Sequence, residues 1–460
     1  MPQQQVAREM LRPPKALAAL ALICSLTCAS GCAATLPEQR QASAAKAADG
    51  RRRLETSRSL SPVVFVPGVG GSQLDAKLDG AHKSHPLCRS HTANWFNVWL
   101  NINLLNPIGL ICLNDILRLE YNRTTKLTSS PKGVQVSAHE FGSLDSVEFL
   151  DRSAHLPGTA YFRTIVGALE TRLGFQANEN MFGAPYDFRR APNELAEFDA
   201  NLTALIERAY IENNFEPITL ICHSMGCLNT VHLLNARTQH WKDVYVRRLV
   251  ALGAPWRGSF RALSSLLLGD NLGIPFVDDH KLRKTQITFP SLLYLLPQRP
   301  AAPAPIAPVE LVATSSKVYT FDNLDELFVD AKLDDQREMW LNVRNYTLDL
   351  RAPNVELWCL YGTGLATPTK LEFDGELLES RATQATSLDG DGTVGLESSM
   401  GCAEFKRAQE AASKGRYAVH LRPFAGVGHV AMLRSKQVAE YIADEILGGG
   451  GGARERARAQ

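Results

Sequence analysis

The residue with the clearest chemical potential is Ser224, which lies in the run from Ile218 to Cys227. An apolar, β-branched stretch ends at this His-Ser-Met-Gly segment, and residues 228–234 continue with helical spacing. A sharp turn between a strand and a helix exposes the serine hydroxyl, and the N–H of Met225 then lies at a helix N-terminus, ready to stabilise an oxyanion. The alternative is a serine that only caps the helix beginning at Met225. The spacing favours a nucleophile.

Cys222 departs from the G-x-S-x-G pattern, because it stands where that pattern has its first glycine. A small side chain still fits where a strand and a helix approach closely, so this departure weakens the prediction without removing it.

A serine nucleophile needs a base, and the base needs an acid to orient it. His429 is the candidate base, because neighbouring glycines let its loop carry the imidazole over the sheet edge. Asp391 is the preferred acid, because Thr393 resumes ordered structure soon after it, and Asp389 is the competitor. This Asp-Gly-Asp-Gly run is also compatible with a plain turn or a calcium loop. The distal glutamate of a calcium loop is absent, so neither a metal nor another cofactor is expected.

The loop from Pro67 to Gly71 follows the first expected strand and is rich in glycine. We expect it to supply the second oxyanion donor, the N–H of Gly70, which would act together with the N–H of Met225. A simple tight turn is the alternative interpretation of this loop.

Alternating strand and helix patterns predict the fold class. Strand patterns lie at 62–68, 218–222, 248–252, 355–361 and 418–423, and helical patterns at about 161–173, 194–213, 226–237 and 434–447. This alternation indicates a mostly parallel sheet covered by helices on both faces. Together with the order serine, aspartate, histidine along the chain, it predicts an α/β-hydrolase.

The ends of the chain differ in composition from its centre. Residues 1–31 resemble a signal peptide, with basic residues before an apolar stretch shorter than the ~20 residues that span a bilayer. A lipoprotein site at Cys32 and an uncleaved anchor are the alternatives. We expect a disordered linker at 32–58, a hydrolase domain at 59–447 and a disordered tail at 448–460. The signal predicts the secretory pathway, with a secreted or lysosome-like destination, and the net charge of +1 gives no reason to expect nucleic acid.

Secretion permits disulfides and glycosylation. Cys222 and Cys227 flank the expected turn, where a bridge would distort it, so we expect them to be free and accessible to bulky thiol reagents that block the site. The natural pairs are then Cys88–Cys112 and Cys359–Cys402, although sequence alone leaves the connectivity open. The glycosylation acceptors are Asn122, Asn201 and Asn345.

Several further motifs occur in order between about residues 60 and 447. They are VFVPG (64–68), QLDAKL (73–78), WLN (99–101), YNRT (121–124), GAPYDFRRAPNE (183–194), HSMG (223–226), WKD (241–243), LGAPW (252–256), GDN (269–271), CLYGTG (359–364) and DGDGTV (389–394). Together they resemble the lecithin:cholesterol acyltransferase family, most closely its lysosomal phospholipase A2 branch.

The resemblance implies a phospholipase A that forms an acyl-serine and passes the acyl group to water or to a lipid alcohol. It implies Ser224, Asp391 and His429 as nucleophile, acid and base, supports both predicted disulfides, and places Asn122 at a glycosylation position of the family. Val69 stands where the two branches have an aspartate or a cysteine, so an acidic pH optimum is not implied.

A segment without Lys, Arg, Asp or Glu runs from residue 90 to residue 114, and its apolar residues recur at helical spacing. We expect an amphipathic helix in a membrane-binding insertion at about 79–118, with Trp95, Phe96, Trp99 and Leu100 at the lipid surface. A helix buried against the core is the alternative. A second insertion, at about 258–353, is expected to form a cap or lid with glycine hinges near its start.

The leading hypothesis is therefore a phospholipase A and O-acyltransferase without a cofactor. Its expected partners are a phospholipid membrane or lipoprotein-like particle and a lipid alcohol acceptor, and it is expected to be a monomer. The alternatives are a catalytically silent lipid-binding or lipid-transfer protein on the same fold and a general esterase.

Overall fold

The computed structural model describes residues 60–152, 157–274, 277–299, 309–379 and 381–449. The expected signal peptide, the linker and nearly all of the expected tail lie outside these described residues. Within the described part of the chain, no helix combines the length and apolar character needed to cross a bilayer.

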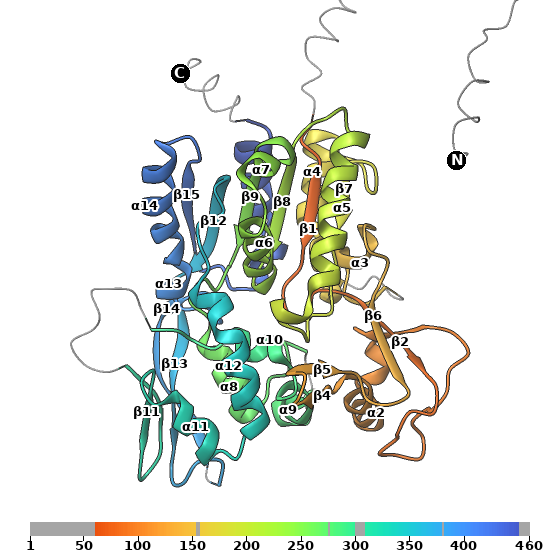
Figure 1. Cartoon of the computed structure of the whole chain (residues 1–460), viewed down its shortest axis with the longest axis vertical. Coiled ribbons are helices and arrows are strands. Elements are labelled where there is room, and N and C mark those ends of the chain that lie inside the picture. The colour runs from red at the N-terminus through yellow and green to blue at the C-terminus, as the bar shows by residue number, and fades with distance from the viewer. Residues whose placement is uncertain (1–59, 153–156, 275–276, 300–308, 380, 450–460) are drawn as a thin grey trace, which may run out of the picture. The chain divides into compact units, whose positions relative to one another are not determined.

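The centre of the fold is a six-stranded sheet in which all neighbouring strands are parallel, in the order β15-β12-β9-β8-β1-β7. These strands lie side by side in the upper half of Figure 1. Their bounds are β1 (Val63–Val66), β7 (Met181–Gly183), β8 (Ile218–His223), β9 (Val246–Leu252), β12 (Glu356–Thr363) and β15 (Val419–Ala425). The predicted α/β fold with a mostly parallel sheet is confirmed.

Helices cover both faces of this sheet, because alternate side chains of each strand point to opposite faces. In β1, Val63 and Phe65 pack in one apolar cluster, and Val64 and Val66 pack in another. The first cluster includes α4 (Arg163–Leu173), α15 (Ala431–Arg434), α16 (Lys436–Tyr441) and η4 (Ile442–Leu447). The second includes α5 (Ala196–Glu212), α6 (Met225–Asn235), α7 (Gln239–Tyr245) and α14 (Gly401–Ser413).

The segment between β1 and α4 forms a small antiparallel sheet with short helices. The sheet has the order β3-β2-β6. Its elements and their neighbours are β2 (Leu74–Leu78), β3 (Phe96–Trp99), η1 (Ile102–Leu104), α2 (Pro107–Leu117), β4 (Glu120–Asn122), β5 (Leu127–Ser129), β6 (Val134–Ala138), α3 (Asp145–Glu148) and η2 (Pro157–Thr159).

The expectation of an amphipathic helix around residues 95–105 is wrong. Residues 96–99 form the strand β3, in which Trp99 pairs with Leu74 of β2. The α-helix begins only at Pro107, after Asn106 has capped it by accepting a hydrogen bond from the N–H of Gly109. Asparagine at the cap and proline in the first turn are start signals that outweigh the helical spacing upstream of them.

A second insertion follows β9 and lies beyond the carboxyl ends of the central strands (Figure 1). Its helices are α8 (Phe260–Leu268), α9 (Asp279–Gln286), α10 (Pro290–Tyr294), α11 (Leu324–Asp330) and α12 (Asp334–Leu348). Its strands β10 (Glu310–Ala313) and β11 (Val318–Thr320) join β13 (Leu365–Phe373) and β14 (Ala382–Gly390) in a sheet of order β11-β10-β13-β14. The remaining short helices are η3 (Pro192–Glu194) and α13 (Leu396–Ser399). This insertion occupies the expected cap region, and its role as a lid stays a prediction.

Candidate active site

Ser224 occupies a strained turn between β8 and α6. Its backbone has φ 53° and ψ −129°, and its side chain makes no capping hydrogen bond to α6. A non-glycine residue rarely adopts a positive φ, and such strain is typical of functional sites. The absence of a cap contact contradicts the alternative in which Ser224 only caps the helix.

The turn packs tightly against the loop that follows β1. A β-carbon added to Gly226 would lie 2.2 Å from the carbonyl oxygen of Pro67, and one added to Gly68 would lie 2.7 Å from Cβ of Ser224. Only glycine fits at these two positions without a backbone shift. The strand–turn–helix segment and the glycine loop therefore form one closely packed junction.

Three side chains from distant segments meet at this junction. Nε2 of His429 lies 2.9 Å from Oγ of Ser224, and Nδ1 of His429 lies 2.8 Å from Oδ2 of Asp391. All three residues are buried. Since a carboxylate only accepts, Nδ1 of His429 carries the proton, and Nε2 is then free to accept the hydroxyl proton of Ser224.

Asp391 is ionised in this buried position. Burial alone raises its pKa, but His429 and the N–H groups of Val394 and Thr393 outweigh burial and hold the pKa below its ordinary value. Those two N–H groups donate to Oδ1 over 2.7 Å and 3.0 Å. Asp389, the competing candidate, is exposed and accepts a hydrogen bond from the N–H of Gly364 instead.

The loop after β1 is a tight turn that leaves amide donors free. The N–H of Gly71 donates to the carbonyl of Gly68 over 3.1 Å, and Gly70 has φ +70°. Among the described residues, no acceptor takes the N–H of Val69, Gly70 or Met225. The loop therefore offers two amide donors rather than one, and Gly70 as the oxyanion donor stays a prediction.

Two of the four residues expected at a lipid surface are buried. Trp99 is 3% exposed and Leu100 is 6% exposed, so neither faces solvent in this structure. The indole N–H of Trp99 donates to the carbonyl of Gly70 over 2.9 Å. Pairing of β3 with β2 turns the Trp99 ring inward. The helical spacing of the apolar residues in this segment did not indicate this orientation. Trp95 is 46% exposed, and Phe96 is half-buried.

The structure contains both predicted disulfides and a third one. Cys88–Cys112 and Cys359–Cys402 have Cα atoms 5.3 Å and 6.6 Å apart, and those of Cys222 and Cys227 are 4.9 Å apart. The expectation that Cys222 and Cys227 are free is therefore wrong. The sharp turn folds α6 back toward the end of β8, which brings both Cα atoms within bridging range. Both residues are fully buried, so the expected block by thiol reagents is also wrong.

The predicted glycosylation acceptors are all exposed. Asn122 ends β4, Asn201 lies on α5, and Asn345 lies on α12.

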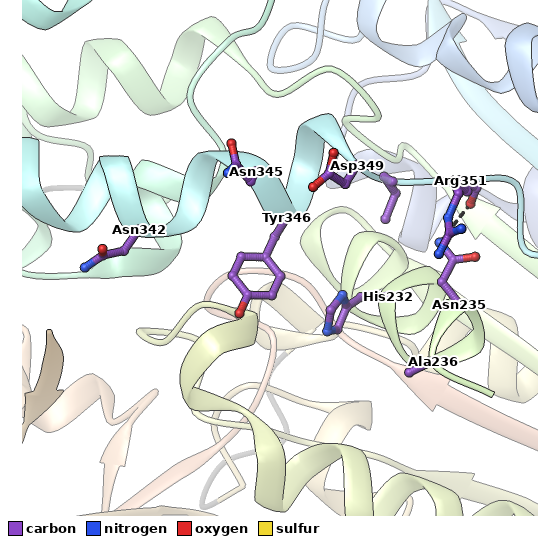
Figure 2. Close-up of a pocket in the computed structure, with 9 residues that line it drawn as sticks. His232, Asn235, Ala236, Asn342, Asn345, Tyr346, Asp349 and Arg351 are labelled. Atoms are coloured by element: carbon purple, nitrogen blue, oxygen red, sulfur yellow. Dashed lines mark hydrogen bonds between the residues drawn. The ribbon is translucent and has the colours of Figure 1, made fainter. Parts of the chain in front are cut away.

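Asn345 also lines a cavity of about 510 Å³ between α6 and α12, where His232 faces Tyr346 (Figure 2). His232 follows Ser224 by eight positions, which corresponds to about 12 Å along the helix. This cavity is therefore separate from the site around Ser224.

Sequence reasoning missed two buried residues beside the nucleophile, Tyr161 and His223. The position of His223 directly before Ser224 was a signal that could have drawn attention to it. Tyr161 begins the segment that leads into α4, far from any motif, so no sequence signal identified it.

Comparisons with known proteins identify the family of this chain. A family model described as lecithin:cholesterol acyltransferase matches residues 95–436. The human protein named lysosomal phospholipase A and acyltransferase is 37% identical over 388 residues, which cover 84% of this chain and 90% of that protein. Phosphatidylcholine-sterol acyltransferase of Papio anubis is 35% identical over 396 residues, which cover 86% of this chain and 87% of that protein.

A solved structure shares the fold at low sequence similarity. The Tle4–Tli4 complex contains a chain with a TM-score of 0.52 and 14% identity, and the match covers 84% of this chain and 98% of that chain. This likeness shows the fold alone. The family model, by contrast, matches more than half of the sequence, and the two relatives exceed 30% identity over most of its length. The chain therefore belongs to the lecithin:cholesterol acyltransferase family.

Proposed function

We propose that this protein is a serine phospholipase A that also transfers acyl groups to lipid alcohols. The observation that carries the proposal is the hydrogen-bonded series from Ser224 through His429 to Asp391 at a strained strand–helix turn. The printed names of the two relatives, a phospholipase A and acyltransferase and a phosphatidylcholine-sterol acyltransferase, support the substrate class.

In the first half-reaction, His429 Nε2 takes the hydroxyl proton of Ser224 as Oγ attacks the ester carbonyl carbon. The Asp391 carboxylate stabilises the imidazolium that forms. The N–H of Met225 and the N–H of Gly70 stabilise the oxyanion of the tetrahedral intermediate. His429 then gives its proton to the departing lysophospholipid oxygen, which leaves an acyl-serine.

In the second half-reaction, water or a lipid alcohol gives its proton to His429 and attacks the acyl-serine. The same oxyanion donors act again, and the returning proton restores the Ser224 hydroxyl. The products are a free fatty acid with water and an acylated lipid with an alcohol. The acceptor that reaches the acyl-serine first therefore decides between hydrolysis and transfer.

We further propose that a docking loop, defined as residues 87–112, contacts phospholipid surfaces. It contains the exposed apolar side chains Leu87, Trp95, Ile108 and Ile111, of which Leu87 is 71% exposed. The Cys88–Cys112 disulfide closes this loop. Exposed apolar side chains together with tryptophan favour the headgroup region of a bilayer.

We propose a secretory route for the protein, which the exposed glycosylation acceptors and the three disulfides support.

The test combines active-site labelling with product analysis. A fluorophosphonate should modify Ser224 of the wild type and leave Ser224→Ala unlabelled, as measured by intact mass and peptide mapping. Mixed-chain phosphatidylcholine vesicles, with and without a sterol or ceramide, should yield lysophospholipid and the acylated alcohol. Absence of both labelling and lysophospholipid would instead identify a lipid-binding protein, and activity confined to monomeric esters would identify a general esterase.

A further inference from the structure

A second series of hydrogen bonds runs beneath the nucleophile. The hydroxyl oxygen of Tyr161 lies 3.0 Å from the N of Gly68 and 2.6 Å from Nδ1 of His223. Nε2 of His223 lies 3.2 Å from the carbonyl oxygen of His429. Tyr161 and His223 are both buried. The series thus joins the glycine loop, the residue before Ser224 and the main chain of His429.

Only one arrangement of protons satisfies every contact. The carbonyl oxygen of His429 can only accept, so Nε2 of His223 carries the proton and Nδ1 is an acceptor. The hydroxyl of Tyr161 must then donate to Nδ1, and its oxygen accepts from the N–H of Gly68. Burial, together with the nearby His429, lowers the pKa of His223 to about 3. His223 is therefore neutral at physiological pH and does not compete with His429 for the hydroxyl proton.

Packing fixes the same groups independently of the hydrogen bonds. A β-carbon on Gly71 would lie 2.4 Å from Cζ of Tyr161, so the phenol ring is pressed against the glycine loop. A β-carbon on Gly68 would lie 3.3 Å from Nδ1 of His223. The loop that contains Gly70 therefore cannot move without disturbing Tyr161 and His223.

We propose that Tyr161 is a positioning residue for acyl transfer, which holds the glycine loop, His223 and the main chain of His429 in one fixed unit. This inference rests on the proposed function. Tyr161 does not touch the reacting atoms, and it acts through the N–H groups of the loop and the placement of His429. Misplacement of catalytic groups by about 1 Å costs on the order of 100-fold in rate, so the effect belongs in kcat rather than in substrate affinity.

The variant Tyr161→Phe removes only the hydroxyl. With a soluble short-chain ester, we expect kcat to fall by about 10- to 100-fold while KM changes by less than about twofold. Labelling of Ser224 by a fluorophosphonate should slow in parallel. The control is Tyr294→Phe, which removes an equally buried hydroxyl that has no hydrogen-bond partner among the described residues. Its kinetics should match those of the wild type.

A kcat within twofold of the wild type in Tyr161→Phe would overturn the inference, and so would equal losses in both tyrosine variants. His223→Gln interrupts the same series at its next member and keeps the test decisive if Tyr161→Phe does not fold. Where both fold, the double variant should be no slower than the slower single variant, and additive losses would contradict a shared role. Ser224→Ala separates the two claims. If Ser224→Ala keeps wild-type activity, the proposed function fails, whereas an inactive Ser224→Ala beside an unimpaired Tyr161→Phe refutes this inference alone.

Discussion

Asp391 keeps its negative charge in a buried site because three N–H groups donate hydrogen bonds to its carboxylate. His429 donates to one carboxylate oxygen, and the N–H groups of Thr393 and Val394 donate to the other. A charged and fully hydrogen-bonded carboxylate fixes the imidazole in the tautomer that can accept a proton from Ser224. This role requires the negative charge, since a neutral amide can also donate and so can hold the wrong tautomer.

We therefore predict that Asp391→Asn lowers kcat by roughly 10³- to 10⁴-fold with a similar KM. Its effect on stability depends on pH, because the pKa of Asp391 in the folded protein lies below its ordinary value of 3.8. A depressed pKa stabilises the fold above that ordinary value, and the contribution disappears as pH falls through the lower native pKa. Urea unfolding of both proteins between pH 3 and pH 7 measures this. A stability difference that stays constant toward low pH would contradict the assignment.

For two nearby tryptophans, Trp99 and Trp95, we predict opposite effects on the hydrolysis of a soluble ester. Trp99 donates to the carbonyl of Gly70, so Trp99→Phe should lower kcat about tenfold on vesicles and on a soluble ester alike. Trp95→Ser should weaken sedimentation with phosphatidylcholine vesicles and leave hydrolysis of the soluble ester unchanged, because Trp95 is exposed on the docking loop. If Trp95→Ser loses both activities equally, Trp95 has a folding role instead.

At the scale of elements, local signals predicted the strand, turn and helix around Ser224, but they did not reveal which distant segments pair with one another. The strand, turn and helix around Ser224 are adjacent in sequence, so their residue pattern determines their arrangement. The segment at 95–105 has helical spacing, yet its residues 96–99 pair as β3 with β2, which lies about 20 residues upstream. Apolar periodicity does not reveal such a partner. Similarly, the Cys222–Cys227 bridge depends on how sharply α6 folds back, which the sequence does not state.

Vesicle binding by the docking loop should depend on the Cys88–Cys112 disulfide. Replacing Cys88 and Cys112 with alanine frees a loop with a sequence separation of 24 residues, which the chain-entropy model equates with about 3–4 kcal/mol of stability. We expect vesicle binding to fall as well, because the exposed apolar side chains lose their fixed arrangement. The matched control replaces Cys359 and Cys402 and should lower thermal stability without selectively lowering vesicle binding. Equal vesicle binding in both variants would contradict a role for the loop.

At the scale of the whole molecule, one buried arginine connects three regions. Arg189 pairs with Asp187 over 2.7 Å, and its Nη1 donates to the carbonyl of Leu117 at the end of α2. Its own carbonyl accepts from the N–H of Ser291 in α10. Both insertions are thus bonded to the segment that follows β7.

Arg189→Met should therefore destabilise the entire fold by roughly 3–5 kcal/mol, because it leaves the Asp187 carboxylate buried with a weakened partner set. Urea unfolding followed by tryptophan fluorescence measures this loss. The control is Arg172→Met, which removes exposed ion pairs with Asp444 and Glu440 and should leave the unfolding midpoint nearly unchanged. A small effect of Arg189→Met would show that the two insertions are held mainly by apolar packing.

The crowding around the Ser224 turn and the glycine loop limits how this protein can be altered. Gly68, Gly71 and Gly226 each lie where an added methyl group would overlap a neighbour. Engineers who want a different acyl-chain length or a larger acceptor gain no usable volume at these positions. Diversity for directed evolution belongs elsewhere in the chain, and libraries that randomise the three glycines should return mostly inactive clones.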